Sequence, residues 1–218
     1  MRHGSDMSGQ FDSADVALVL ADMRRPRHEG ALPAIQSRLR DFQKRSFPGT
    51  ANAGRGKKAR FDLEDLVHLA CAFELVDVDL STARCIDVVS GSAPVLTQAA
   101  LIAWATHRAK EIDRPNSRML AYVLPTSTTH SSGAIVAFDE GDHYPRQDHW
   151  PGRRSRIAVD LTAMTGDLVD ALEGDSFRMH ASEVDEAFRA LAKARLGHSD
   201  PGQWPVFRPD TRDDRVLR

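Results

Sequence analysis

The chain has 218 residues, a formal net charge of −2 at pH 7, and hydrophobic and charged fractions of 41% and 28%. These values are typical of a soluble globular protein, with enough residues for one large domain or two small ones. No apolar stretch approaches the ~20 residues that a membrane-spanning helix needs, and the polar start lacks the apolar core of a secretory signal. Because the chain has only two cysteines, Cys71 and Cys85, we expect a cytoplasmic protein in a reducing compartment.

The charges are distributed unevenly along the chain. Residues 24–60 carry eleven Lys/Arg and two acidic residues, whereas residues 61–218 carry seventeen basic and twenty-five acidic residues. The nearly neutral total therefore conceals a strongly basic segment in the N-terminal part. Such an asymmetry indicates a polyanionic partner, and double-stranded DNA is the commonest one.

In chain order, residues 1–12 are mostly polar and are predicted to be disordered. Hydrophobic periodicity and the positions of Pro and Gly predict helices over residues 15–25, 32–47, 63–76, 81–91 and 92–112. Asp62 is a good N-cap for the third of these helices, with Asp65 in the position of the reciprocal cap, and Ser81 caps the fourth. The chain is therefore expected to be mostly helical to about residue 112.

The pattern changes at Arg114-Pro115, and we place a domain boundary near residue 113. Beyond it, three short β-like runs alternate with loops rich in Ser, Thr, Gly and Pro, and two amphipathic helices follow. The runs lie at residues 119–124, 134–138 and 156–160, and the helices at 161–172 and 182–196. The sequence thus predicts an α+β protein whose small C-terminal α+β module spans residues 114–197, with a loose tail over 198–218.

The helix predicted over residues 32–47 has one apolar and one basic side. At 100° per residue, the apolar side consists of Leu32, Ile35, Leu39 and Phe42. The opposite side and its flank carry Gln36, Ser37, Arg38, Arg40, Lys44 and Arg45. An exposed face of this kind suits the DNA major groove, where Arg pairs with guanine, Gln with adenine and Lys with phosphate. The alternative interpretation is an ordinary solvated amphipathic helix.

A basic, glycine-containing segment follows that helix. Residues 52–61 read NAGRGKKARF and lead directly into the next predicted helix. A Gly-containing turn between short strands would form a wing whose cations contact the phosphate backbone, namely Arg55, Lys57, Lys58 and Arg60. The connection between the first two helices offers further, weaker candidates for phosphate contact in Arg24, Arg25 and Arg27.

Residues 15–89 resemble the winged helix-turn-helix of the MerR-like transcription regulators. The resemblance rests on FPG at Phe47 after the second helix, on RFDLEDLVHL from Arg60, and on AFELVDVDLS from Ala72. It implies a winged-helix DNA-binding domain over residues 13–91 and a connecting or dimerisation helix over residues 92–113. It also implies DNA binding as a homodimer. The paired aromatics of the family's recognition helix are missing, so metal or drug sensing is not carried over.

Other chemistries find less support in the sequence. Cys71 and Cys85 lie among apolar residues of their predicted helices, which favours core packing over metal sensing. Residues 138–150 contain Asp, Glu and His at a spacing that matches no metal-ligand template, and His130 lies in a Ser/Thr-rich loop without the setting of a catalytic base. No Gly-rich phosphate loop or dinucleotide fingerprint occurs. We therefore expect no enzymatic activity, no metal and no cofactor.

The sequence as a whole predicts a sequence-specific, DNA-binding regulator of transcription that acts as a dimer. The apolar face of the helix over residues 161–172 either closes a small core against the strands or forms the dimer seam, for which the helix over residues 92–112 is the other candidate. Two alternatives remain open. The first is an excisionase-like architectural or recombination accessory protein that bends DNA with the same winged helix. The second is a module whose basic segment docks onto an acidic protein partner rather than DNA.

Overall fold

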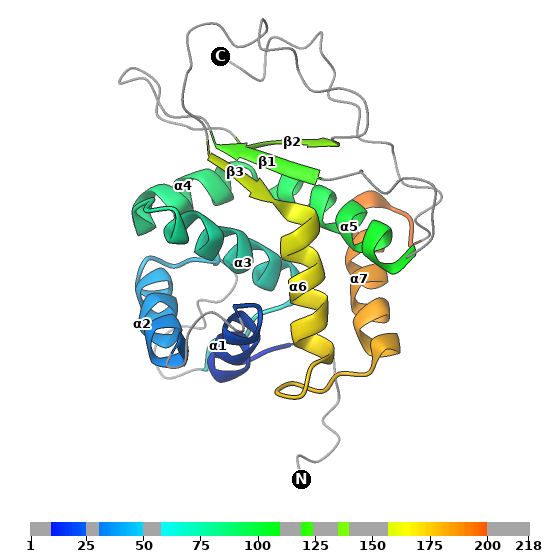
Figure 1. Ribbon diagram of the computed structural model, residues 1–218, viewed down its shortest axis with the longest axis horizontal. Coiled ribbons are helices and arrows are strands. Elements are labelled where there is room, and N and C mark those ends of the chain that lie inside the picture. Colours follow the sequence, from blue (N-terminus) through cyan, green and yellow to red (C-terminus); the bar gives the residue numbers. More distant parts are fainter. Residues whose placement is uncertain are drawn as a thin grey trace, which may run out of the picture.

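The computed structural model describes residues 10–24, 31–49, 58–109, 119–123, 135–139 and 157–199. The described part is mostly helical, with a small antiparallel sheet along one side (Figure 1). Its elements are α1 (Ser13–Asp22), α2 (Ala31–Lys44), α3 (Leu63–Asp77), α4 (Thr82–Gly91), α5 (Ala93–Ala109), β1 (Met119–Val123), β2 (Ile135–Asp139), β3 (Ile157–Asp160), α6 (Leu161–Glu173) and α7 (Ala181–Leu196). Each corresponds to a helix or strand that the sequence predicts, with ends displaced by only a few residues.

Two helices begin with the same capping arrangement. The Asp62 carboxylate accepts from the Asp65 amide at 2.9 Å, and the Asp62 amide donates to the Asp65 carboxylate at 3.1 Å. The same reciprocal pair joins Asp12 and Asp15 at the start of α1, with both distances at 3.0 Å. Each pair satisfies backbone donors that the first turn of a helix leaves without a partner. The cap predicted at Asp62 is thus confirmed, and the one at Asp12 is an unpredicted counterpart.

The segment before α1 is part of the fold. Phe11 and Phe61 form an isolated antiparallel bridge, and the Phe11 side chain is buried. The prediction of a disordered segment reaching residue 12 is therefore wrong for residues 10–12. Local composition gave no sign of this pairing, because Phe61 follows Phe11 in the sequence only after α1, α2 and the basic segment. Residues 1–9 lie outside the described part.

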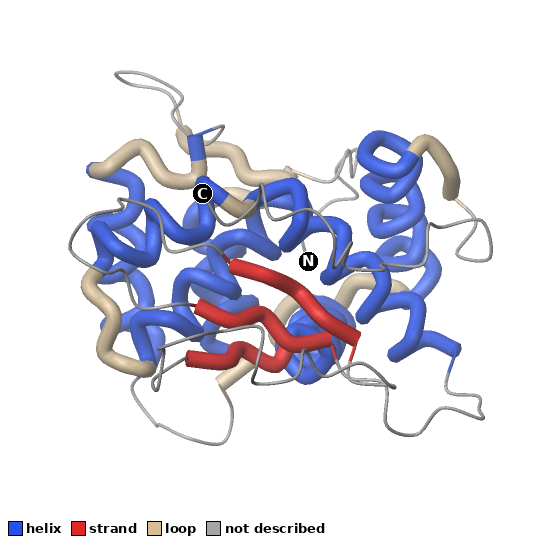
Figure 2. Tube along the Cα trace, turned by 90° about the horizontal axis from the view of Figure 1, so that it is seen from above, coloured by secondary structure: helices blue, strands red, loops and turns tan. Residues whose placement is uncertain are grey.

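The sheet has three antiparallel strands in the order β2-β1-β3. Ala121 in the central strand pairs with Ala137 on one side and Val159 on the other. Met119, Ala121 and Val123 alternate along β1 and are buried, as expected for a strand with one face on a core. Figure 2 shows the three strands side by side in one layer over the helices.

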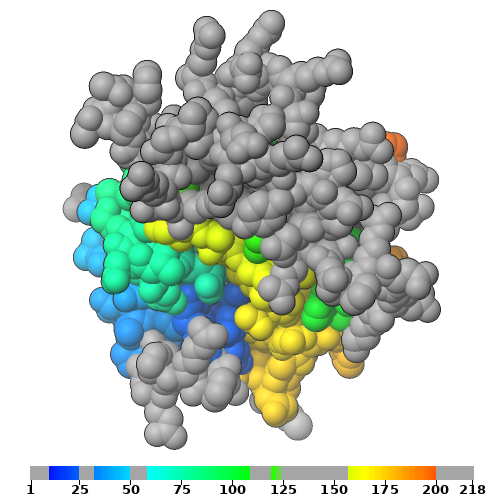
Figure 3. Space-filling view, turned by 45° about the horizontal axis from the view of Figure 1, so that its top comes forward, coloured from blue at the N-terminus to red at the C-terminus, as the bar shows by residue number. Residues whose placement is uncertain are grey.

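One hydrophobic core runs through the whole described part. Its buried residues extend in sequence from Phe11 to Ala192 and include members of every helix described. Helix α6 packs against α1, α3 and α5, and Figure 3 shows it directly beside the N-terminal helices. The boundary expected near residue 113 therefore does not separate two cores. Sequence composition changes there because the sheet begins, whereas the chain then returns to the N-terminal helices through α6.

Helix α5 lies at the centre of this core. Only Pro94 and Thr106 among its described side chains are exposed, and Leu96, Leu101 and Trp104 are buried. No single helix of the described part is long and apolar enough to cross a membrane. Helices α4 and α5 together would pass in length and composition, but they meet at an angle of 79° and carry the core's own buried residues.

Candidate nucleic-acid interface

Helix α2 is docked on the core by its apolar side. Ile35, Leu39 and Phe42 are buried, at 4%, 2% and 0% exposure. The Phe42 ring lies 5.5 Å from the rings of both Phe47 and Phe73, centroid to centroid. These contacts join α2 to α3 and to the turn that follows α2 itself. The predicted apolar face is therefore confirmed, and burial of the three side chains fixes which side of α2 faces outward.

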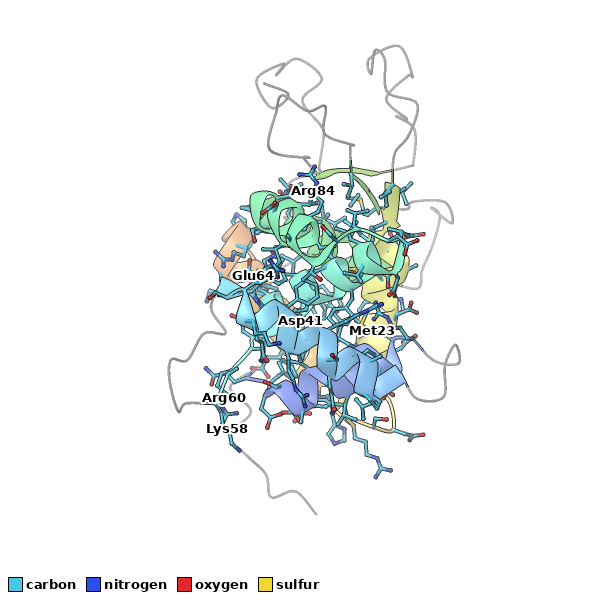
Figure 4. The ribbon with its side chains drawn as sticks, turned by 90° about the vertical axis from the view of Figure 1, so that its left-hand side faces the viewer. Met23, Asp41, Lys58, Arg60, Glu64 and Arg84 are labelled. Atoms are coloured by element: carbon cyan, nitrogen blue, oxygen red, sulfur yellow. The ribbon has the colours of Figure 1, made fainter. Side chains whose placement is uncertain are left out.

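The outward side of α2 carries the predicted polar residues. Gln36 is half-buried, and the other five are exposed, namely Ser37, Arg38, Arg40, Lys44 and Arg45. Asp41 shares this side and forms an exposed ion pair with Lys44, Oδ1 to Nζ, at 3.2 Å. An exposed ion pair of this type contributes little stability, so Lys44 can exchange Asp41 for another anion at small cost. Figure 4 faces this surface, with Asp41 labelled on α2.

Two of the four residues predicted for the wing lie within the described part. Lys58 and Arg60 are exposed and immediately precede the buried Phe61. In the view of Figure 4 they project beside α2. Arg55 and Lys57 lie outside the described residues, as do Arg25 and Arg27 between α1 and α2. We define the α2 surface as the exposed cations Arg40, Lys44, Arg45, Lys58 and Arg60.

Arg24 is a structural side chain rather than a surface cation. Its side chain is only 14% exposed, and its Nε donates to Asp77 Oδ2 at 3.0 Å. The guanidinium also lies over the Phe73 ring, 5.2 Å from the centroid, and 3.6 Å from a Glu74 oxygen. The weak assignment of Arg24 to phosphate contact is therefore corrected. Its partners lie on α3 some fifty residues away, which sequence spacing does not reveal.

Arg38 shares the same acidic partner. Its Nη1 donates to Asp77 Oδ1 at 2.8 Å, so the two Asp77 oxygens hold one arginine each. Unlike Arg24, Arg38 is 48% exposed and lies at the edge of the outward side of α2. Asp77 was not predicted from the sequence. A carboxylate at the last residue of a helix is unfavourable without a cationic partner, and this is the signal that could have indicated it.

A polar network links α3, α5 and α7, buried at His68 and Thr97 and exposed at Arg195, and it too was not predicted. Thr97 Oγ1 lies 2.9 Å from Glu64 Oε1 and 3.1 Å from His68 Nε2. Arg195 of α7 donates through Nε to the other Glu64 oxygen at 3.0 Å. Burial lowers the pKa of His68 below its usual value of 6.5, and the carboxylates of Glu64 and two neighbouring residues oppose this shift. The neutral imidazole is therefore the form that the fold prefers.

The cysteines pack in the core, as the sequence predicts. Both residues are fully buried. Burial raises the pKa of Cys71 to about 12 and that of Cys85 to about 11, which leaves both as thiols at neutral pH. Among the described residues, no group of three or more His, Cys, Asp or Glu side chains is arranged to hold a metal ion. His130, and residues 140–150 of the predicted Asp/His-rich loop, lie outside them.

The two predicted dimer seams are both internal. The α6 residues Leu161, Met164, Leu168 and Leu172 are at most 3% exposed and close the core against α1, α3 and α5. Helix α5 is covered in the same way, and its Trp104 stacks on Phe188 of α7 with centroids 5.1 Å apart. Their amphipathic patterns reflect packing within one chain. Neither helix offers the free apolar stripe that a coiled-coil dimer requires.

Neither family models, nor curated proteins, nor solved structures show a significant match to this chain. The resemblance to MerR-like regulators therefore stays an expectation from residues 47–49, 60–69 and 72–81.

Proposed function

We propose that the protein binds double-stranded DNA with the α2 surface and acts as a sequence-specific transcription regulator. The observation that carries the proposal is the orientation of α2. Its apolar side is buried through Ile35, Leu39 and Phe42, which leaves Arg40 and Lys44 on the outward side. A helix fixed in this way can enter the major groove without disturbing the core, because Arg40 and Lys44 already face solvent.

The second support is the local architecture around the basic segment. Phe11 and Phe61 exchange backbone hydrogen bonds of 2.7 and 2.9 Å, which ties the end of that segment to the residue ahead of α1. Helices α1 and α2, which pack against each other, thus form one unit on the core together with this bridge. In our proposal this unit is a MerR-like winged helix, with Lys58 and Arg60 at the base of the wing and Arg55 and Lys57 farther along it.

The residues of the α2 surface would have different tasks. Arg40, near the middle of the outward side with Ser37 and the half-buried Gln36, would contact base edges. Lys58 and Arg60, from the segment beside α2, would contact phosphates and position the helix. Asp41 reduces the positive charge of α2 and favours a limited set of contacts over general adhesion to any polyanion.

A homodimer remains part of the proposal, reading half-sites about one helical turn apart. The seam cannot be the buried face of α5 or α6, so a dimer would have to use another surface or form on DNA itself. An architectural protein would use the same α2 surface without promoter control. A module for an acidic protein partner would use its charges without preferring any duplex.

The proposal is tested with two arginine variants. Arg40→Ala removes a proposed base contact, whereas Arg189→Ala removes an exposed arginine on α7, which lies on the opposite side of the molecule from α2 (Figure 1). On a duplex selected by the wild-type protein, Arg40→Ala is expected to lose about 1–3 kcal/mol of binding free energy, with reduced preference over random duplex. Arg189→Ala is expected to bind as the wild type does. Equal binding by both variants would contradict the role of α2.

A further inference from the structure

The acidic end of α3 lies against one flank of α2. Glu74 and Asp77 occupy the last turn of α3, Asp79 follows in the turn after it, and that last turn contains no basic residue. The partial negative charge of a helix C-terminus makes carboxylates unfavourable there, unless cations from elsewhere compensate for them. Here the compensation comes from Arg24, which follows α1, and from Arg38 on α2.

The two arginines are held to different degrees. Arg24 is 14% exposed and is fixed by Phe73, Glu74 and the Leu20 carbonyl, so it serves the fold. Arg38 is 48% exposed and forms an ion pair with Asp77, which is itself 42% exposed. Asp77 is also held by Arg24, so it stays beside Arg38 even when this exposed pair opens. An incoming DNA phosphate can therefore reach Arg38, but the phosphate has to compete with Asp77 for it.

We propose that Asp77 masks Arg38 and thereby limits the number of DNA phosphates that the protein engages. This inference rests on the proposed function. Arg38 lies on α2 two residues before Arg40, and Arg45 follows in the turn just after the helix. A released Arg38 would therefore add one phosphate contact to those of the α2 surface. Phosphate contacts add affinity for every duplex equally, because they carry no sequence information. Asp77 would thus determine the affinity for DNA of any sequence and the salt dependence of that affinity. Sequence preference would depend on the residues in the middle of α2.

The test is a double-mutant cycle on full-length protein, with Asp77→Asn, Arg38→Ala and the double variant. Each is titrated with a selected duplex and with a random duplex over a range of salt concentrations. Asp77→Asn is expected to bind both duplexes several-fold more tightly, with a log–log salt slope steeper by about 0.9, the value of one phosphate contact. Arg38→Ala alone is expected to bind like the wild type. The double variant is expected to lose the gain of Asp77→Asn.

Asp79→Asn is the matched control. It removes the same charge from the same end of α3, where the ion pairs of the described part involve Glu74 and Asp77 but not Asp79. It therefore releases neither Arg24 nor Arg38, and its salt slope is expected to equal that of the wild type. Asp79 has a φ of 65°, a conformation that Asn also tolerates, so the control is not expected to strain the backbone.

Three results would overturn the masking of Arg38. The first is an unchanged salt slope in Asp77→Asn, and the second is a gain that persists when Arg38 is also removed. The third is a loss of affinity in Arg38→Ala alone, which does not depend on Asp77→Asn being folded. If the wild type binds DNA and Arg40→Ala weakens that binding, any of these three results would contradict the masking of Arg38 but not the proposed function. Failure of the wild type to bind any duplex would defeat both.

Discussion

Phe11 and Phe61 exchange two backbone hydrogen bonds, of 2.7 and 2.9 Å, across a separation of fifty residues. Each is followed by the same arrangement, an Asp N-cap and a reciprocal Asp three residues later. The pair therefore anchors the starts of α1 and α3 side by side. Helix α2 lies between these two anchored points in the sequence and is docked on the core.

The Phe61 side chain is expected to be essential for stability and its neighbour Arg60 dispensable. Phe61 is fully buried, and Phe61→Ala should lower the free energy of unfolding by about 3–5 kcal/mol, from lost burial and the cavity it leaves. Arg60 is exposed, and Arg60→Ala should change the free energy of unfolding by no more than about 0.5 kcal/mol. Urea denaturation measures both. A small effect of Phe61→Ala would show that the anchor contributes little.

Arg60 and Lys58 are instead expected to matter for DNA binding. Lys58→Ala and Arg60→Ala should each weaken binding to selected and random duplexes alike, and each should reduce the salt slope by about one. The same is expected of Lys57→Ala. Fluorescence anisotropy at several salt concentrations gives both quantities. A change confined to one duplex sequence would instead mean that these cations read bases.

Stability is expected to fall in mild acid because of His68. Its pKa is lowered in the folded protein, so the unfolded chain binds more protons once the pH drops below the ordinary value of 6.5. The contribution of neutral His68 is thus complete above that pH and is lost as the pH falls toward the lower, folded-state pKa. His68→Gln, which retains a donor toward Thr97, should remove this part of the pH dependence. Melting temperatures between pH 5 and 8 would show it, and identical pH profiles for the two proteins would contradict it.

The two thiols are expected to be unreactive in the native protein. Cys71 and Cys85 are fully buried with pKa values of about 12 and 11, so thiolate is scarce at neutral pH and reagents have no access. Alkylation followed by mass measurement should find both free at pH 7.5, and both modified in urea. Rapid modification of either thiol without denaturant would reopen the possibility of a thiol sensor.

Local patterns predicted the elements well, because caps and hydrophobic periodicity act over a few residues. Asp62 and Ser81 begin their helices as expected, and the buried face of α2 follows from the spacing of Ile35, Leu39 and Phe42. The same information could not tell a helix buried by its own chain from one that meets a second chain. Helix α5 therefore looked like a dimer seam until α6 and α7 were seen to cover it.

Long-range partners account for the other errors. The bridge at Phe11, the two arginines on Asp77 and the network around Thr97 all join residues 25 or more positions apart. No sequence period connects them. As a result, the sequence predicted which cations of α2 are exposed. Only the fold shows that one of them, Arg38, is paired with Asp77 of α3.

The most direct test of the account is a selection of genomic DNA fragments with purified wild-type protein at near-physiological salt, followed by sequencing of the retained fragments. We expect enrichment of one short sequence, repeated in inverted orientation if the protein binds as a dimer, and loss of that enrichment in Arg40→Ala. Equal retention of all fragments would reduce α2 to a phosphate-binding surface of an architectural protein. Retention of none would contradict DNA binding and favour an acidic protein partner.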